Sequence, residues 1–245
     1  MVLFDAQFTA PYAKQFRAYA DSLGKPIERI IISHAHPDHF IGLGIAFKDI
    51  EDRIYALEGT KQAIQSQGPG MLEVWRKRFP AGMMPDKIVV PTQTITPGKA
   101  TIDNVRYEFV RYLNGETDEQ LVIKLPDLGV LLVQDLVFNG IHSYMGNNTL
   151  DGWITILEEL QSLSGYDTVL AGHGHPGDMS VLAKNKAYLK DVKRILNNVD
   201  NPKDFKAQLI AKYPGLAEQM LIDISIPGLF KSKGQKHSSK EGDKK

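Results

Sequence analysis

Hydrophobic and polar positions follow two different periods along this chain, and together they predict an α/β protein. Short apolar runs of strand length alternate with stretches in which apolar residues recur every three or four positions. Strands interleaved with helical stretches are typical of sheets that are covered by helices. The helical pattern occupies residues 11–23, 41–47, 60–79, 181–198 and 202–213, and a further helix is indicated by the stripe Leu150, Ile154, Leu157 and Leu160.

Three details of the helical pattern affect the expected packing. Gly24 closes the first helix, on which Tyr12, Phe16 and Tyr19 share one face. Gly68-Pro69-Gly70 should interrupt the helix at 60–79, because proline and glycine both disfavour a helix interior. Trp153 belongs to the apolar stripe of its helix and is expected in the core.

The predicted strands fall into two groups, which we expect to form two sheets. The early strands are expected at 2–4, 29–32 and 54–57, and the later ones at 88–90, 100–102, 105–112, 120–125, 130–134 and 168–170. With 245 residues, 42% of them hydrophobic, the chain is long enough for one large two-sheet core or two small ones, and α/β proteins of this size are commonly single domains. We therefore expect a single domain over 1–230, with helices at 202–223, and a disordered Lys-rich tail over 231–245.

Composition excludes several function classes. The formal net charge of zero argues against a nucleic-acid binder that works by counterion release, and no apolar run approaches the length of a membrane span. The chain has no cysteine, which excludes disulfides and thiolate metal ligands. A small-molecule partner is the remaining expectation, and we expect a cytoplasmic location because no targeting segment is recognisable. The sequence does not predict an oligomeric state.

The most informative chemistry lies directly after the strand at 29–32. Residues 33–39 read Ser-His-Ala-His-Pro-Asp-His, which places His34, His36, Asp38 and His39 within six positions. Burying so many imidazoles and a carboxylate is costly unless a cation uses their lone pairs. In an extended loop His34, His36 and Asp38 would point to one side and His39 to another, so that this segment could serve two metals.

This His-x-His-x-Asp-His segment resembles the hallmark of the metallo-β-lactamase superfamily. The resemblance implies a four-layer αββα fold with one or two divalent metal ions bound between the sheets. It also implies further ligands, and Asp135 after the run at 130–134 and His173 in Ala-Gly-His-Gly match the family's Gly-Asp and Gly-His-Gly positions. Zinc is the expected metal, with iron or manganese as alternatives.

The chain departs from the family pattern at its third histidine. Where the family has Gly-His-Thr, this sequence reads Gly115-Glu116-Thr117. Glutamate is itself a metal ligand, and it would make the site less positive and richer in oxygen donors, which favours iron or manganese more than an all-imidazole site does. The alternative is that Glu116 is a solvated turn residue beside a weak or empty metal position.

Other residues near the expected ligands have open roles. His142, seven residues after Asp135, is interpreted as an additional ligand, a residue that supports a ligand, a proton donor to a leaving group, or an ordinary loop histidine. Tyr144 and His142 are candidates for substrate contact. His175 is expected to face solvent, and His237 in the polar tail is assigned no role.

The family resemblance runs from about residue 2 to residue 198 and lacks the family's usual first β-hairpin. We therefore expect either a compact variant or a shortened chain whose first sheet has an uncovered edge.

The predicted activity is hydrolysis of a small ester, lactone or thioester by a metal-bound hydroxide. The resemblance assigns His34, His36 and Glu116 to a first metal and Asp38, His39 and His173 to a second, with Asp135 bridging both. Asp38 would also orient the attacking water and accept its proton. The alternatives are an iron-dependent oxidoreductase or oxygenase of the same fold and a degenerate scaffold without catalysis, because fold alone does not determine function.

Overall fold

The computed structural model describes the backbone of residues 1–242 and the side chains of residues 1–231. The chain divides into two compact units, one formed by Met1–Arg111 with Glu119–Ile123 and the other by Tyr112–Asp118 with Lys124–Lys245. The single domain expected from the sequence therefore stays a prediction.

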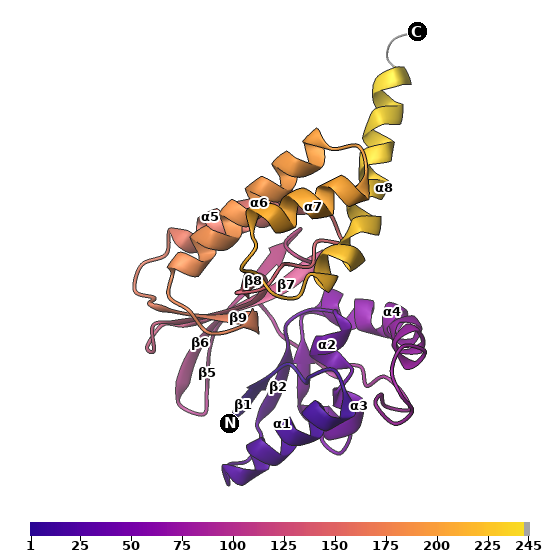
Figure 1. Ribbon diagram of the computed structural model, residues 1–245. Coiled ribbons are helices and arrows are strands. Elements are labelled where there is room, and N and C mark those ends of the chain that lie inside the picture. The colour runs from indigo at the N-terminus through magenta and orange to yellow at the C-terminus, as the bar shows by residue number, and fades with distance from the viewer. Residues whose placement is uncertain (243–245) are drawn as a thin grey trace. The chain divides into compact units, whose positions relative to one another are not determined.

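The first unit contains the predicted early strands and the helices between them (Figure 1). Its elements are β1 (Val2–Phe4), α1 (Ala10–Ser22), β2 (Arg29–Ile32), α2 (Pro37–Phe40), α3 (Leu43–Ala46), the 3-10 helix η1 (Glu51–Arg53), β3 (Ile54–Ala56), α4 (Glu58–Arg76), β4 (Gln93–Thr94), β5 (Gly98–Ile102), most of β6 (Val105–Leu113) and the first part of β7 (Glu119–Leu125).

The first sheet has the order β1-β2-β3-β4, and all of its neighbouring strands are parallel. In β2 the side chains of Ile30, Ile31 and Ile32 are fully buried, as expected for a parallel strand with both faces covered. Ile30 and Ile32 join Phe40 and Phe47, which come from the segment after β2, in one hydrophobic cluster. This packing fixes the start of the His-rich segment.

Two sequence predictions differ from the structure in this unit. Helix α4 continues through Pro69, because Ile64, Gly68 and Leu72 form one buried face that spans the proline. The strand predicted at 88–90 is absent from the described backbone, since Pro91 follows it and cannot donate a ladder hydrogen bond; only the short β4 forms nearby. On α1, Phe16 is partly buried and packs against the core, whereas Tyr12 (61%) and Tyr19 (64%) are exposed and alanines supply the fully buried positions.

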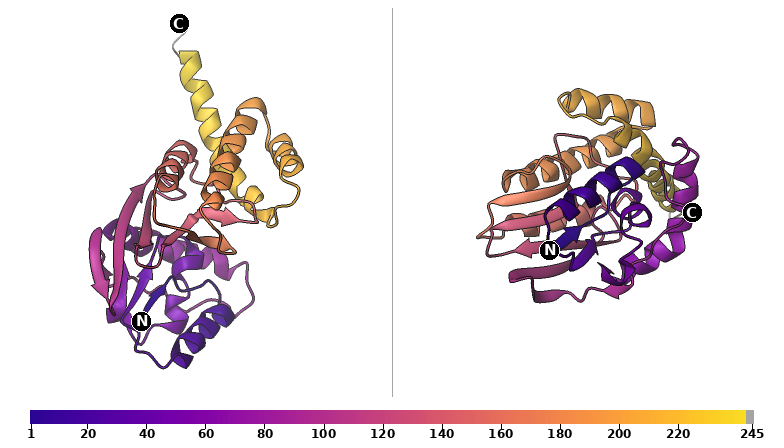
Figure 2. Two further views of the ribbon diagram at one scale, coloured as in Figure 1. Left: turned by 90° about the vertical axis from the view of Figure 1, so that its left-hand side faces the viewer. Right: turned by 90° about the horizontal axis from the view of Figure 1, so that it is seen from below.

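The second unit contains the later helices and strands. Its elements after the end of β7 are β8 (Val130–Asn139), α5 (Leu150–Gln161), β9 (Thr168–Gly174), α6 (Ser180–Asn198), α7 (Pro202–Lys212) and α8 (Met220–Gly242). Strands β8 and β9 are parallel neighbours at one end of the second sheet, whose order is β5-β6-β7-β8-β9. Helices α5 and α6 lie side by side on one side of β8 and β9, as Figures 1 and 2 both show.

The core of the second unit follows the predicted apolar stripe of α5. Leu150, Trp153, Leu157 and Leu160 are all buried, and the Trp153 indole N–H donates to the Leu136 carbonyl over 3.0 Å. That bond satisfies the one polar atom of a side chain that is otherwise suited to the core. Trp153 is therefore a core residue, as predicted.

Helix α8 contacts the loop that follows β8. The Met145 N–H donates to the Ser225 hydroxyl over 2.8 Å, and Gly228 comes so close to the Gly146 carbonyl that a Cβ at position 228 would overlap it. The backbone of residues 231–242 continues α8, where no proline follows Pro227 and lysine, glutamine and glutamate favour helix. The disordered tail expected from the sequence stays a prediction. Residues 243–245 of that prediction lie outside the described part of the chain.

Candidate metal centre

The His-rich segment lies at the carboxyl end of β2 in the first unit. His34 is fully buried and His39 is 5% exposed. The ring centroid of His34 lies 4.9 Å from that of His36 and 4.1 Å from that of His39. Within this unit two pairs, His34 with His36 and Asp38 with His39, have possible ligand atoms within 4.8 Å of each other. That spacing allows both members of a pair to reach one cation, since metal–ligand bonds are about 2.0–2.2 Å long.

The geometry of this segment differs from the extended loop that we expected. The chain is extended only as far as His36, and Pro37 then begins the helical turn α2, which contains Asp38 and His39. Proline is well suited to the first position of a helix because its fixed φ matches and its missing N–H is not needed there. The prediction that alternation alone orients Asp38 and His39 is therefore wrong; a helical turn orients them.

Asp5, at the end of β1, holds the segment in place. Its carboxylate accepts the Ser33 N–H over 2.8 Å and the Ser33 hydroxyl over 3.0 Å, and its Oδ2 lies 2.7 Å from the His39 Nδ1. The Ser33 hydroxyl oxygen in turn lies 2.9 Å from the His34 Nδ1. The Asp5 carboxylate thus contacts the His39 imidazole directly and the His34 imidazole through the Ser33 hydroxyl.

These contacts decide which ring nitrogen can bind a metal. With Nδ1 of both His34 and His39 engaged by the protein, a cation would be bound through Nε2. Metal-binding histidines usually have their other nitrogen hydrogen-bonded in this way, which fixes the tautomer and the ring orientation. Asp5 and Ser33 were not predicted in this role from the sequence. The available signal was a polar residue at the end of each of two adjacent buried strands.

In the second unit, Asp135 lies inside β8 and not after its end as predicted. The pairing of β8 with β9 shifts register between Leu132 and Gln134 and again between Gln134 and Phe138, and Gln134 has a φ of +47°. This irregularity displaces the strand locally, and irregular ladders of this kind commonly redirect a functional side chain. Asp135 is 2% exposed.

His173 lies beside Asp135 on the neighbouring strand. Its Nε2 is 3.3 Å from the Asp135 Oδ2, and its ring stacks on Phe138 with centroids 5.1 Å apart. Gly172 permits this approach, because a Cβ at position 172 would overlap the Asp135 carboxylate. The glycine before His173 therefore has a steric role that the motif did not reveal.

Glu116 lies in the turn before β7 and is 1% exposed, so the interpretation as a solvated turn residue is wrong. The Asn114 N–H donates to the Asp118 carbonyl over 3.0 Å, and the Thr149 hydroxyl donates to the Gly115 carbonyl. Within the second unit, possible ligand atoms of Glu116 and Asp135 lie within 4.8 Å of each other, and so do those of Asp135 and His173.

The loop after β8 places two further candidates in this unit. Burial raises the pKa of Tyr144, and the negative charge of Glu116 raises it further, which indicates that the phenol is within electrostatic reach of that carboxylate. His142 is fully buried, with Nδ1 2.9 Å from the Tyr188 hydroxyl, so it is not an ordinary solvated loop histidine. His175 is exposed, as predicted.

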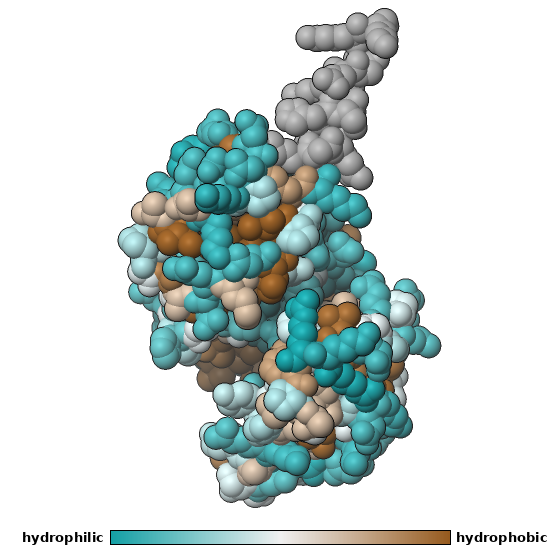
Figure 3. Space-filling model, turned by 45° about the vertical axis from the view of Figure 1, so that its right-hand side comes forward, coloured by the Kyte–Doolittle hydropathy of each residue, from teal (hydrophilic) through white to brown (hydrophobic). Residues whose placement is uncertain are grey.

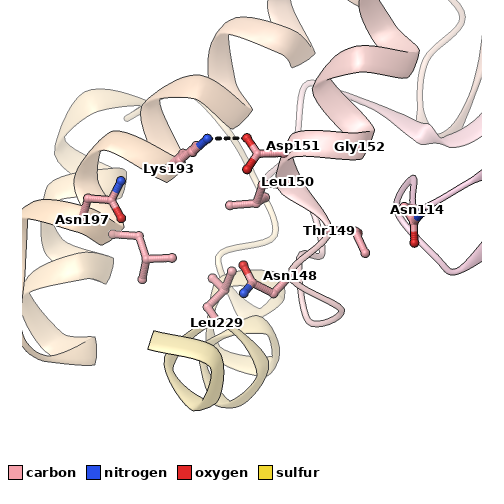
Figure 4. Close-up of a pocket in the computed structure, with 10 residues that line it drawn as sticks. Asn114, Asn148, Thr149, Leu150, Asp151, Gly152, Lys193, Asn197 and Leu229 are labelled. Atoms are coloured by element: carbon pink, nitrogen blue, oxygen red, sulfur yellow. Dashed lines mark hydrogen bonds and ion pairs between the residues drawn. The ribbon is translucent and has the colours of Figure 1, made fainter. Parts of the chain in front are cut away.

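A separate polar pocket lies in the second unit, at the start of α5 (Figure 4). Asp151 and Lys193 pair across it, and Leu229 of α8 lines its lower side. None of the candidate ligands lines this pocket. Hydrophilic residues cover most of the face drawn in Figure 3, and among the described residues no helix combines the length and apolarity that crossing a bilayer requires.

Comparison with known proteins gives one curated relative at low identity. The linear primary-alkylsulfatase of Pseudomonas sp. (strain ATCC 19151) is 27% identical over 197 residues, which are 66% of this chain and 36% of that protein. The chain thus spans about a third of the length of this relative.

Solved structures resemble the fold more broadly. The metallo-beta-lactamase of Pontibacter korlensis superposes with a TM-score of 0.60 at 19% identity, covering 78% of this chain and 82% of that one. The metallo-beta-lactamase of Hirschia baltica gives 0.55 at 18% identity, covering 77% and 78%. These similarities confirm the predicted α/β metallo-β-lactamase fold.

The sequence pattern of the metallo-beta-lactamase superfamily matches residues 2–173, which include every candidate ligand. The two sheets, the His-rich segment after β2 and the paired Asp135 and His173 agree with that match. The chain belongs to the metallo-β-lactamase superfamily.

Proposed function

We propose that the protein is a metal-dependent hydrolase with a binuclear metal centre. His34, His36 and Glu116 would bind one cation, and Asp38, His39 and His173 the other, with Asp135 shared between them. The pairs within each unit support this assignment, because residues assigned to the same cation lie within ligand spacing of each other wherever they belong to the same unit. The family match, which spans both units, supports it independently.

The donor set fits a divalent cation. Four imidazoles and three carboxylates are ligands that zinc, iron and manganese all accept, and the engagement of Nδ1 on His34 and His39 presents one nitrogen of each ring for coordination. We propose zinc first. The carboxylate of Glu116 makes iron or manganese the alternative.

A bound divalent cation would supply Lewis acidity, which lowers the pKa of a bound water and polarises the oxygen under attack. The Asp38 carboxylate would orient the attacking water and accept its proton, at Oδ2, which lies 3.5 Å from the His39 Nε2. Asp5 would hold the imidazole of His39 in a fixed orientation during the reaction.

The segments around the proposed centre provide no basic side chain for an anionic group of a substrate. The four segments that carry the candidate ligands and the loop after β8, residues 33–40, 115–117, 134–149 and 171–178, contain no lysine or arginine. Two divalent cations would outweigh the three carboxylates, so the centre itself would attract an anion, but these segments offer no cationic side chain that could bind an anionic group away from the metals. A small carboxylic ester, lactone or thioester fits this balance, and the absence of basic residues from these segments is the observation that carries the substrate proposal.

An alkyl sulfate is the second candidate, and the name of the Pseudomonas relative favours it. Its sulfate group would have to be bound by the metals and by neutral donors such as Tyr144 alone. Direct competition between a carboxylic ester and an alkyl sulfate of equal chain length distinguishes the two proposals.

The test is elemental analysis of protein purified without added metal, combined with hydrolysis assays on ester, lactone, thioester, phosphodiester and alkyl sulfate substrates. We expect one or two zinc ions per chain and turnover of an uncharged ester that His36→Ala abolishes and His175→Ala, at an exposed histidine, does not. Iron with oxygen uptake would instead support an oxidoreductase. Failure to bind any metal would support a non-catalytic scaffold and contradict the proposal.

A further inference from the structure

The strongest feature that the proposed function leaves unused is the carboxylate of Glu119, the first residue of β7. It lies at the amino end of α4, where its Oε2 accepts the Thr60 N–H over 2.6 Å and the Thr60 hydroxyl over 3.2 Å. The Arg111 Nε, from β6, donates to the Glu119 Oε1 over 2.6 Å. All three residues belong to the first unit.

Helix α4 gains from this carboxylate because its own sequence supplies no cap. The N-cap residue is Leu57, which has no side-chain acceptor, and no side-chain cap bond is formed there. The first N–H groups of a helix have no partner within the helix, and a carboxylate beside them is also stabilised by the helix dipole. Glu119 therefore caps α4 from a strand, 59 residues after Thr60 in the chain.

Gly59 provides the space for this cap. A Cβ at position 59 would lie 2.7 Å from the Glu119 Oε2 and 2.9 Å from its Oε1, closer than a Cβ can approach an oxygen. The side chain of Glu119 is 12% exposed and that of Arg111 is 49% exposed, so the bonds to Thr60 are better shielded from solvent than the ion pair. The close fit and the hydrogen bonds together hold the carboxylate in one place.

Two residues further along, β7 contacts the segment that carries the candidate ligands. The Leu121 N–H donates to the Ser33 carbonyl over 3.0 Å, and this carbonyl belongs to the peptide bond between Ser33 and His34. The Ser33 hydroxyl lies 2.9 Å from the His34 Nδ1. Both Ser33 and Leu121 are buried. Strand β7 thus fixes the peptide before His34, and Ser33 fixes its ring.

We propose that Glu119 is a positioning residue for the candidate ligand His34. Because it holds the start of β7 on α4, it keeps the Leu121 N–H in place for the Ser33 carbonyl. Ser33 in turn orients the imidazole that would bind metal. Asp5 also holds Ser33, which is therefore restrained by both β1 and β7. The inference rests on the proposed metal centre and adds a residue that touches neither metal nor substrate.

Glu119→Gln tests the hydrogen bonds of the carboxylate. The amide oxygen can still accept the Thr60 N–H, but the amide nitrogen would face the Arg111 donor. Loss of a partner behind a metal ligand costs 10- to 100-fold in affinity, and for a residue that acts through Ser33 we expect zinc binding to weaken about tenfold. Competition with a chelator measures it. Glu58→Gln makes the same charge change at an exposed position in the first turn of α4 and should leave the affinity unchanged.

Gly59→Ala displaces the same carboxylate without altering it. The added Cβ must push the flexible end of Glu119 aside, while alanine favours helix more than glycine does. We expect weaker zinc binding here too. Gly70→Ala, in open space on the same helix, is the control and should bind zinc like the wild type.

The visible spectrum of cobalt(II)-substituted protein separates positioning from a general loss of stability. Glu119→Gln and Gly59→Ala should change the cobalt absorption bands, because the orientation of a ligand changes, whereas both control variants should keep the wild-type spectrum. A merely structural role would lower the melting temperature and leave the spectrum of the folded protein unchanged. Wild-type spectra and zinc affinities in both test variants would overturn the proposal.

A double-mutant cycle tests whether Glu119 acts through Ser33. Ser33→Ala removes the hydroxyl that contacts the His34 Nδ1. If Glu119 acts through this hydroxyl, the two effects on zinc affinity overlap, and Glu119→Gln should weaken binding by less than about threefold in the Ser33→Ala background. Fully additive effects would mean a route that bypasses Ser33 and would overturn the proposal.

Amide hydrogen exchange in the protein as purified keeps this inference separate from the proposed function. The Leu121 N–H should exchange about tenfold faster in Glu119→Gln than in the wild type, and no faster in Glu58→Gln, because only the first substitution loosens its bond to Ser33. A wild type that binds no zinc or cleaves no ester contradicts the hydrolase proposal, and the exchange rate then decides the role of Glu119. An unchanged rate at Leu121 would overturn that role.

Discussion

The Oδ2 atom of Asp5 lies 2.7 Å from the Nδ1 atom of His39, and both side chains are almost completely buried. Asp5, directly after β1, therefore provides the carboxylate that orients His39, a candidate ligand 34 residues later in the chain. The same carboxylate reaches His34 through the Ser33 hydroxyl. The orientation of the His-rich segment thus depends on a residue outside it.

Replacing Asp5 by Asn should weaken metal binding without removing a ligand. The amide is uncharged and cannot accept from both Ser33 and His39 as the carboxylate does, and loss of a partner behind a metal ligand typically costs 10- to 100-fold in affinity. Competition with a chelator measures the change. Asp21→Asn, which removes an exposed carboxylate paired with Arg17, is the control and should leave the affinity unchanged. Equal affinities for wild type and Asp5→Asn would show that Asp5 does not support the site.

Gly172→Ala should disturb Asp135 through steric overlap. The added Cβ would overlap the Asp135 carboxylate and press on the Gln134 backbone, so either the side chain or β9 must move. We expect lower metal content and a loss of about 1–3 kcal/mol in the free energy of unfolding, as for other overpacked sites. Urea unfolding and elemental analysis measure both effects. Gly215→Ala, where nothing lies within 4 Å of the new Cβ, should change neither.

Glu116→Ala should reduce metal stoichiometry and activity, because it removes a buried carboxylate within ligand spacing of Asp135. Glu116→His should retain metal and shift the preference toward zinc, since imidazole is the softer ligand. Metal competition among zinc, iron and manganese measures the preference. Asp118→Ala, at an exposed position of the same turn, is the control. Unchanged stoichiometry in Glu116→Ala would remove Glu116 from the ligand set.

Acidification should destabilise the wild type more than His142→Gln. Burial holds the pKa of His142 below its usual 6.5. At a pH between that lower value and 6.5, His142 is therefore protonated in the unfolded chain but neutral in the folded protein. The unfolded state then binds more protons, and stability is lost as the pH falls. Urea midpoints at pH 7.5 and 5.5 for both proteins measure the difference. His175→Gln, at an exposed histidine, should behave like the wild type; an equal acid sensitivity of wild type and His142→Gln would contradict the prediction.

The sequence predicted the parts of the site whose residues are close together in the chain. β2 was predicted with its observed bounds, because an apolar run bounded by a polar motif has few alternatives. Four candidate ligands could be recognised in one short segment for the same reason. Asp5 could not be recognised, because its contacts with Ser33 and His39 exist only once β1 pairs with β2.

The errors have the same origin in tertiary structure. The sequence ended the strand before Asp135, but pairing with β9 extends β8 to Asn139 and creates the irregularity at Gln134. Likewise Gly68-Pro69-Gly70 indicated a break in a helix that buried contacts on both sides of Pro69 keep continuous. Local preferences were read correctly in both places, and long-range packing outweighed them.

The close approach of Gly228 to the Gly146 carbonyl links the C-terminal helix to the loop that carries Tyr144. Since any larger residue at position 228 would push the two backbones apart, substitutions on α8 and on this loop must be compatible with each other. A residue larger than glycine at position 228 should therefore be tolerated only together with a compensating change in the loop at Gly146. The backbone of the loop and that of α8 thus restrict each other at this one contact.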